Sequence, residues 1–247
     1  MECERMSRSA TLSRSVTLFR AFLHEQDDPD GFYSVLAADS VAQLSRWADL
    51  SGATVLDVGG GAGYFADAFR AAGATYIGLE PDAGEMTARG EPEPGTLRGS
   101  GEELPIRSGA LDVCYSSNVL EHVRRPWVMA DEMVRVTKPG GIVYLSFTPW
   151  FSPWGGHETA PWHYLGGHRA RRRYARRNGV EPKNKFGESL FVAKAGGAAK
   201  WAKNCPDADL LAVLPRYHPW WAAWVAKVPV LREFASWNYV VVLRRRA

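Results

Sequence analysis

An aspartate followed by a cluster of glycines is the part of this 247-residue sequence best suited to chemistry. A short apolar stretch ends at Asp57, and four of the five residues from position 59 to position 63 are glycine: Gly59, Gly60, Gly61 and Gly63. Glycine is required where the backbone turns sharply or approaches a ligand closely, because a Cβ would collide there. A glycine loop between a strand and a helix is typical of nucleotide-binding sites. The pattern therefore predicts such a site.

The spacing of the glycines distinguishes between kinds of nucleotide loop. A dinucleotide fingerprint counted from Gly59 requires a glycine at position 64, where this sequence has Tyr64, which argues against an NAD-linked oxidoreductase. No Gly-Lys-Ser/Thr follows, which argues against a Walker-type phosphate loop. The observed Asp-x-Gly-x-Gly-x-Gly resembles motif I of the class I S-adenosylmethionine-dependent methyltransferases. An acid beside the loop would attract the ammonium group of that cofactor. A tight turn alone would need one glycine, not four.

Three further segments resemble this family in the expected order. Glu80 and Pro81 follow a second apolar stretch, and Glu80 lies 23 residues after Asp57, where an acid binds ribose hydroxyls. An exposed acid at the end of a strand is the alternative. Residues 99–105 resemble the family's Gly-Asp-Ala-Glu-x-Leu-Pro stretch, in which the acid contacts the adenine amino group. Ser100 occupies the position of that acid, so the resemblance implies a weaker adenine contact.

Residues 117–123 resemble the Leu-Glu-His element that follows the fourth strand of the family and borders the cofactor. His122 in this element is either a base or a residue that orders the loop through backbone hydrogen bonds. The resemblance covers residues 50–148 and implies a site for S-adenosyl-L-methionine. Its predicted cofactor-binding residues are Asp57, Gly59, Gly60, Gly61, Gly63, Glu80, Pro81, Ser100, Gly101, Glu102 and Asn118.

The elements that must position these residues alternate between strands and helices. Short apolar runs predict strands at 55–58, 75–79, 111–116, 142–147, 209–214 and 239–243, and helical spacing predicts a helix over 126–138. The resemblance implies an α/β, Rossmann-like class I methyltransferase fold: a seven-stranded, mostly parallel sheet with its last strand antiparallel and helices on both faces. We expect N-terminal cap helices at 1–50, a cofactor-binding core at 51–148, a substrate-side elaboration at 149–205 and closing strands of the same domain at 206–247.

The elaboration contains the candidate catalytic residues. A long loop, 148–167, starts at the tip of the predicted fifth strand, at the edge where open α/β sheets bind ligands. His157, Glu158 and His163 bring titratable groups to it, and imidazole suits a base that deprotonates a hydroxyl. Loop hydrogen bonding is the alternative role for both histidines. Their spacing is a poor zinc signal, so no metal is predicted.

Charge and tryptophan are distributed unevenly along the chain. Residues 1–149 hold 13 Lys/Arg and 21 Asp/Glu, a net charge of −8, whereas residues 150–247 hold 17 and 6, a net charge of +11. Six arginines lie within 168–177, and three tryptophans within 219–229. Arginine binds phosphate and carboxylate in two-point contacts, and Trp suits surfaces that are partly apolar and partly wet. The second half therefore predicts an anionic partner, unless these are only a solvated helix and packed core.

Composition limits the remaining choices. Hydrophobic residues make up 46% of the chain, no apolar run is long enough to span a bilayer, and residues 1–20 contain no apolar signal region. The three cysteines have neither metal nor disulfide spacing, which is typical of a reducing compartment. We expect a cytoplasmic enzyme, with a peripheral position at the inner membrane face as an option.

The predicted reaction is O-methylation of a lipid, glycolipid or other amphiphilic or anionic small acceptor. RNA is the alternative substrate and the less favoured partner. A non-catalytic S-adenosylmethionine-binding regulatory module is a second alternative, which Ser100 leaves open. The acceptor atom and the oligomeric state are not predicted.

Overall fold

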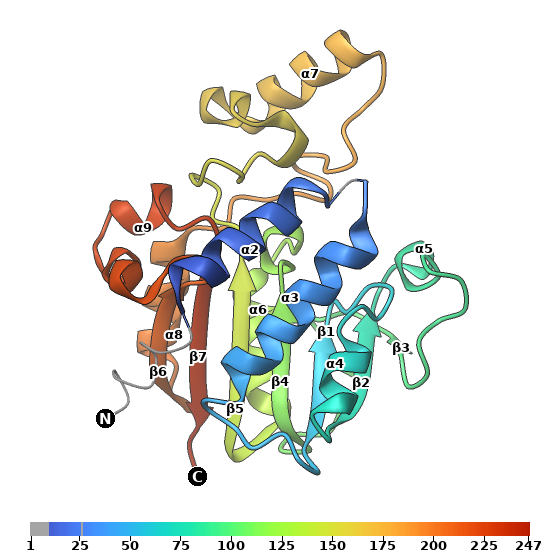
Figure 1. Cartoon of the computed structure of the whole chain (residues 1–247), viewed down its shortest axis with the longest axis vertical. Helices are drawn as coiled ribbons and strands as arrows, with labels where there is room; N and C mark the ends of the chain where they lie inside the picture. Colours follow the sequence, from blue (N-terminus) through green and yellow to red (C-terminus); the bar gives the residue numbers. More distant parts are fainter. Residues whose placement is uncertain (1–9, 26) are drawn as a thin grey trace.

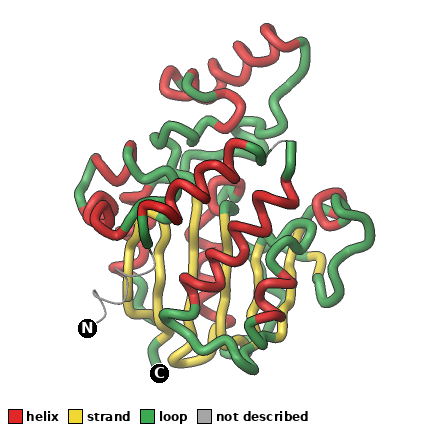
Figure 2. Tube along the Cα trace, viewed as in Figure 1, coloured by secondary structure: helices red, strands yellow, loops and turns green. Residues whose placement is uncertain are grey.

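The computed structural model describes residues 10–25 and 27–247 and is built on one mixed sheet (Figures 1 and 2). The strand order is β3-β2-β1-β4-β5-β7-β6. The strands are β1 (Thr54–Val58), β2 (Thr75–Glu80), β3 (Leu97–Arg98), β4 (Leu111–Ser117), β5 (Thr137–Phe147), β6 (Ala208–Pro215) and β7 (Tyr239–Arg245). Pairing is parallel from β3 to β5, and β7 is antiparallel to both of its neighbours. The predicted fold class is confirmed.

Helices cover both faces of the sheet, because the strands are apolar on both sides. One face packs against α2 (Leu12–Leu23), α3 (Pro29–Leu44) and α4 (Ala66–Ala71), which lie in front in Figure 1. The other packs against α6 (Pro126–Val136) and α8 (Ala195–Asn204). Side chains alternate along β5 with the period of two expected of a strand: Tyr144 belongs to the first cluster and Val143 to the second. The remaining short elements are α5 (Ala83–Met86), α7 (Gly167–Asn178), α9 (Leu231–Phe234), η1 (Leu120–His122), η2 (His157–Thr159), η3 (Trp162–Leu165) and η4 (Trp220–Lys227).

The observed boundaries differ from the predicted ones at two places. The helix predicted over 126–138 ends at Val136, and β5 begins at Thr137, so Pro139, Gly140 and Gly141 belong to β5. The predicted loop over 148–167 contains the two 3-10 turns η2 and η3. The predicted N-terminal cap consists of α2 and α3 where it is described, and its residues 1–9 lie outside the described residues.

The elaboration leaves the carboxyl end of β5 and extends beyond that edge of the sheet, where α7 lies at the top of Figure 1. It is attached to the sheet through η1. A ring nitrogen of His122, Nδ1, lies 2.7 Å from the Ser189 carbonyl oxygen, and the amide of Phe191 donates to the Glu121 carbonyl at 2.8 Å. His122 therefore orders the loop through a backbone contact, one of the two roles expected of it. No helix within the described residues is long and apolar enough to cross a lipid bilayer.

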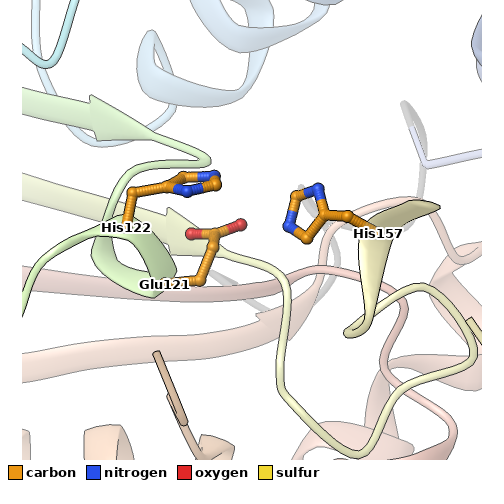
Figure 3. A group of neighbouring side chains, drawn as sticks. All are labelled: Glu121, His122 and His157. Atoms are coloured by element: carbon orange, nitrogen blue, oxygen red, sulfur yellow. The ribbon is translucent and has the colours of Figure 1, made fainter. Parts of the chain in front are cut away.

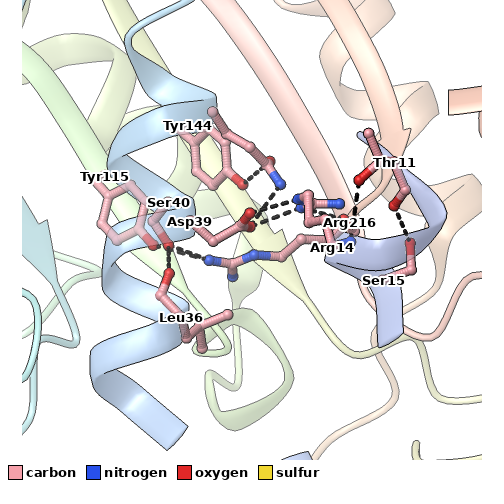
Figure 4. A network of polar contacts seen from close by, with 10 residues as sticks. Thr11, Arg14, Ser15, Leu36, Asp39, Ser40, Tyr115, Tyr144 and Arg216 are labelled. Carbon is pink, nitrogen blue, oxygen red and sulfur yellow. Dashed lines mark hydrogen bonds and ion pairs between the residues drawn. The ribbon is translucent and has the colours of Figure 1, made fainter. Parts of the chain in front are cut away.

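A buried arginine joins three elements beneath the carboxyl edge of the sheet (Figure 4). Arg216 follows β6 and is 2% exposed. Its Nη1 donates to Ser117 of β4 at 2.6 Å and to Ser146 of β5 at 2.9 Å. Its Nη2 donates to Ser40 of α3 and to the Tyr115 hydroxyl. One guanidinium thus fastens α3 to two strands of the sheet.

Polar contacts in the same region also attach α2 to the sheet. Arg14 of α2 donates to Asp39 of α3 at 2.5 and 2.7 Å, and to the Arg216 carbonyl oxygen at 2.9 Å. Figure 4 shows this pair beside the Arg216 side chain. The two N-terminal helices are therefore held against the sheet by polar contacts as well as by their apolar faces.

Arg216→Leu should lower the free energy of unfolding by about 2–4 kcal/mol, because the buried hydroxyls of Ser40 and Ser146 and the half-buried hydroxyl of Ser117 lose a charged donor. For a chain of this size each kcal/mol shifts Tm by about 2–4 °C, which thermal unfolding followed by circular dichroism can resolve. Arg244→Leu, on an exposed position of β7, is the matched control and should be nearly neutral. Equal shifts for the two variants would contradict the role assigned to Arg216.

Candidate active site

The glycine loop connects β1 to α4 and is shaped by its glycines. Gly59, Gly61 and Gly63 have φ of 80°, 51° and 77°, the left-handed region that side chains disfavour. A Cβ on Gly59 would lie 2.4 Å from the Val119 side chain, whereas a Cβ on Gly61 would meet nothing within 4 Å. The loop thus packs against the β4 tip on one side and faces open space at Gly61, so that its backbone is accessible to a ligand.

Asp57 lies beneath this loop. It is 2% exposed, and its carboxylate accepts a hydrogen bond from the Tyr76 hydroxyl at 2.9 Å. A Cβ on Gly60 would come within 3.2 Å of the same carboxylate, so the loop backbone covers it directly. Burial raises the pKa of Asp57 to about 7. A cation bound above the loop would favour the charged form of this carboxylate and lower that pKa.

Glu80 ends β2 next to the loop and is 9% exposed. One carboxylate oxygen accepts from the Gly61 amide at 3.2 Å, and the other accepts from the Asp82 amide at 3.0 Å. Burial raises the pKa of Glu80, an effect that these two amides oppose. The neighbouring Pro81 is exposed. The acid predicted to bind ribose is therefore fixed in position beside the open face of Gly61.

The 99–105 segment, which is predicted to border the adenine, offers weaker contacts to a ligand than the glycine loop and Glu80 do. Ser100 is exposed, and its hydroxyl accepts from the Glu102 amide at 3.1 Å. Glu102 itself forms an ion pair with Arg125 at 2.7 Å and accepts from the Arg125 amide. Gly101 faces Val58 and Met129 so closely that a Cβ would come within about 3.1 Å of both. The carboxylate nearest to the predicted adenine position is thus already engaged.

A cavity of about 650 Å³ lies beyond the carboxyl ends of the strands, next to the glycine loop. It adjoins the loop through Ala62 and Tyr64, and Asn118, with a left-handed φ of 58°, lines it at the β4 tip. Its aromatic lining comes from both ends of the chain: Phe19, Phe22, Phe32, Tyr33, Tyr64, Trp154, Tyr217 and Trp237. Its polar lining includes Glu121, His122, His157, Glu158 and Lys183.

The three predicted catalytic residues are placed differently. His157 lines the cavity, and burial, assisted by the nearby His122, lowers its pKa to about 3, so it is neutral and a weak base near pH 7. Glu158 also lines the cavity but is exposed, and it accepts from the Asn184 amide group at 2.9 Å. His163 is fully buried, with its ring 5.3 Å from that of Trp150, and is not among the residues that line the cavity.

The polar lining of the cavity also includes Glu121, which was not among the residues predicted from the sequence. Glu121 is 1% exposed, and one of its oxygens accepts from the Thr148 amide at 2.9 Å. The ligand-type atoms of Glu121, His122 and His157 lie within 4.8 Å of one another, with the carboxylate between the two rings in Figure 3. The Leu-Glu-His resemblance was the only sequence signal for Glu121, because His157 lies 36 positions further along the chain.

Together, the strand order, the glycine loop after β1 and the acid at the end of β2 define a class I, S-adenosylmethionine-dependent methyltransferase. A family model described as a methyltransferase domain matches residues 56–145. A protein of Mycobacterium marinum named as an uncharacterized methyltransferase is 51% identical over 98% of both chains, and one of Mycobacterium tuberculosis is 51% identical over 96% of both. The chain belongs to this family of methyltransferases.

Solved structures agree on the fold. An S-adenosylmethionine-dependent methyltransferase from Mesorhizobium loti gives a TM-score of 0.57 at 18% identity, covering 87% of this chain and 99% of that one. The [4+2]-cyclase SpnF gives 0.53 at 15% identity, covering 85% and 81%. At these identities the likeness concerns the fold alone, as the cyclase illustrates.

Asp57→Asn should make the protein more stable at pH 8 than the wild type and leave Tm less changed at pH 5. The wild-type carboxyl, with its pKa raised to about 7, contributes fully to stability below pH 4, and that contribution is lost as the pH rises through 7. The amide still accepts from Tyr76 but carries no charge. Scanning calorimetry at both pH values should show a gain at pH 8 of several degrees, since about 1 kcal/mol corresponds to 2–4 °C.

The same variant should bind S-adenosylmethionine at least about tenfold more weakly in calorimetric titration, because the negative charge beneath the loop is gone. Asp67→Asn, at an exposed position of α4, is the control for both measurements. An unchanged affinity would show that Asp57 does not act on the cofactor.

Proposed function

We propose that this methyltransferase transfers the methyl group of S-adenosylmethionine to a hydroxyl or carboxyl oxygen of an amphiphilic, anionic acceptor such as a lipid or glycolipid. The observation that carries the proposal is the cavity beside the glycine loop, which combines a largely aromatic lining with a cluster of polar groups at one side. An acceptor with an apolar body and a polar reactive end matches such a lining.

The cofactor is assigned to the loop side of the site. In this assignment the backbone of Gly59, Gly60, Gly61 and Gly63 holds the methionine part, above the buried charge of Asp57. Glu80, beside Pro81, accepts from the ribose hydroxyls, since its oxygens already lie at hydrogen-bonding distance from loop amides. Ser100, Gly101 and Glu102 border the adenine. Asn118 stands between cofactor and acceptor, because it lines the cavity at the β4 tip.

The aromatic lining favours an apolar acceptor body. Phe22 packs edge-on against Phe32 and Trp154, with ring centres 6.1 and 5.0 Å apart, and so connects the N-terminal helices to the elaboration. Tyr33 stacks on Tyr64 at 4.5 Å, next to the glycine loop. Burying an alkyl chain against such rings contributes about 25 cal/mol per Å² of apolar area. A purely polar acceptor would gain little from this wall.

The anionic part of the acceptor is assigned to α7. Arg171 is paired with Glu181 and Glu188, and Arg173 lies 3.8 Å above the Trp162 ring. The other four arginines of the helix form no ion pair with any acid among the described residues: Arg169, Arg172, Arg176 and Arg177. Together with Arg173 they line a shallow open depression. Such a face suits phosphate or carboxylate groups.

This basic face is close to the cavity. Helix α7 packs against η2, which bears the cavity-lining His157 and Glu158.

Trp220, Trp221 and Trp224 of η4 are 52%, 57% and 53% exposed, so packing of these rings in the core is ruled out. Exposed tryptophans and unpaired arginines together favour a peripheral contact with an anionic lipid surface.

The acceptor class is tested by incubating the purified protein with S-adenosylmethionine carrying a labelled methyl group and with separate lipid and RNA fractions of Mycobacterium marinum, the source of one relative. Label in the organic phase is the expected result. Label in RNA alone would replace the proposal with RNA methylation. Cofactor binding without transfer to any fraction would favour a non-catalytic module.

Reversing charge on α7 should weaken membrane association. Arg172 and Arg176 lie four residues apart on the same helix face, and each basic residue near an anionic surface contributes about 1 kcal/mol. The double variant Arg172→Glu, Arg176→Glu should therefore bind phosphatidylglycerol-containing vesicles at least about tenfold more weakly in sedimentation assays.

Arg107→Glu combined with Arg244→Glu changes the net charge equally, at exposed positions of the loop before β4 and of β7. This control variant should retain vesicle binding. If both double variants lose vesicle binding equally, the effect depends on net charge alone and not on α7. If neither variant loses vesicle binding, α7 is only a solvated helix.

A further inference from the structure

The polar cluster in the cavity contains buried atoms without partners. Glu121 uses one carboxylate oxygen to accept from the Thr148 amide, and its other oxygen, Oε2, is buried and has no hydrogen-bond partner among the described residues. The same is true of the buried Nε2 atom of His157. Burying a polar atom without a partner is costly, so two such atoms in one cluster point to a ligand that binds between them.

The backbone conformation of His157 is a second indication that these residues form a binding site. His157 has a left-handed φ of 47°, a conformation that costs a histidine free energy and aims its ring toward the cavity. Its ring centre lies 5.1 Å from that of His122, and both rings face the Glu121 carboxylate in Figure 3. No hydrogen bond among these three side chains explains the arrangement within the described residues.

The tautomer of His122 is fixed by a backbone contact, as it is in many metal sites. His122 Nδ1 lies 2.7 Å from the Ser189 carbonyl oxygen, so this nitrogen carries the proton and donates it. The lone pair is then on Nε2, which is free to bind a ligand. Metal-ligating histidines typically donate their other ring N–H to a carbonyl or a carboxylate in this way.

We propose that Glu121, His122 and His157 bind one divalent transition-metal cation, such as Zn²⁺, in the wall of the acceptor cavity. Two imidazoles and one carboxylate suit zinc and its first-row neighbours. Bonds of about 2.0–2.2 Å to each ligand place ligand atoms about 3.0–3.5 Å apart. Because one potential ligand atom of each residue already lies within 4.8 Å of the others, a small approach of the three side chains is enough to bind one cation.

All three residues line the cavity, so the bound cation keeps open positions toward the acceptor. The role of the cation in the reaction, described next, rests on the proposed O-methylation. An acceptor oxygen bound to the cation loses its proton more readily and gives it to water. The oxygen then forms a bond to the methyl carbon as the carbon–sulfur bond breaks, its electron pair stays on sulfur, and S-adenosylhomocysteine leaves. In this arrangement His157 serves as a ligand rather than as the proton acceptor.

Metal binding is tested without any methyl acceptor. The full chain, free of a polyhistidine tag and dialysed against a chelator, is titrated with ZnCl₂ by calorimetry and with Co²⁺ by visible absorption. We expect one equivalent of either metal per chain and d–d bands of Co²⁺ bound to nitrogen and oxygen. Saturable one-to-one binding that depends on the cluster supports the site, and no saturable binding overturns it.

Three conservative variants and one control make the test specific. Glu121→Gln keeps the contact with Thr148, His157→Asn keeps a residue that tolerates the left-handed backbone, and His122→Gln removes the third ligand. Each should weaken metal binding at least about tenfold while thermal unfolding shows a folded chain. His24→Asn, on an exposed histidine at the end of α2, should change nothing.

The outcomes separate this inference from the proposed function. Equal metal affinity in the wild type and in the folded cluster variants overturns the metal site, even if a lipid acceptor is found. One-to-one metal binding that the cluster variants abolish supports the site, even if every lipid fraction fails as an acceptor.

Discussion

The aromatic wall of the cavity depends on a guanidinium buried beneath the carboxyl edge of the sheet. Arg216 donates to hydroxyls of α3, β4 and β5, and its carbonyl oxygen accepts from Arg14 of α2. A buried charge is costly unless its hydrogen-bonding capacity is used, so the packing of the N-terminal helices is tied to these contacts. Because α2 and α3 supply Phe19, Phe22 and Phe32, loss of this attachment would open the aromatic side of the cavity.

The parallel part of the sheet brings the rest of the site together. Strands β1, β2, β4 and β5 run in the same direction, so their carboxyl ends lie along one edge. The glycine loop, Glu80, Asn118 and Thr148 follow these four strands in turn. Residues up to 89 positions apart, such as Gly59 and Thr148, therefore meet at one edge, where ligands bind in open α/β folds. The antiparallel β7 lies between β5 and the edge strand β6, so its carboxyl end lies at the opposite edge.

Local patterns made one half of the site predictable. Asp57, the glycines and Glu80 are recognisable because each acts through its own short segment, a strand end or a left-handed turn, and the structure places them as expected beside one another. Six of the seven strands were predictable for the same reason, since apolar runs depend on neighbours in sequence, whereas the two-residue β3 has no such run.

The other half depends on long-range packing that no local pattern encodes. His157 and His163 look equivalent in the sequence, but a 3-10 turn points one into the cavity and the next buries the other against Trp150. Glu121 is buried, and its carboxylate accepts from the amide of Thr148, 27 positions away. Arg216 reads as an ordinary basic residue, because its hydroxyl partners are 70, 99 and 176 positions distant.

The uneven distribution of charge gains a physical meaning from this geometry. The sulfonium donor is a cation, and the assigned loop side holds the carboxylates of Asp57 and Glu80, whereas the basic face belongs to α7, which packs against η2. Transfer of a methyl group from a sulfonium to an anionic oxygen removes one charge of each sign. Charge cancellation is favoured where aromatic side chains exclude water, because separated charges are poorly stabilised there. An acidic core and a basic elaboration thus suit a reaction in which a cation and an anion must be held apart until they react.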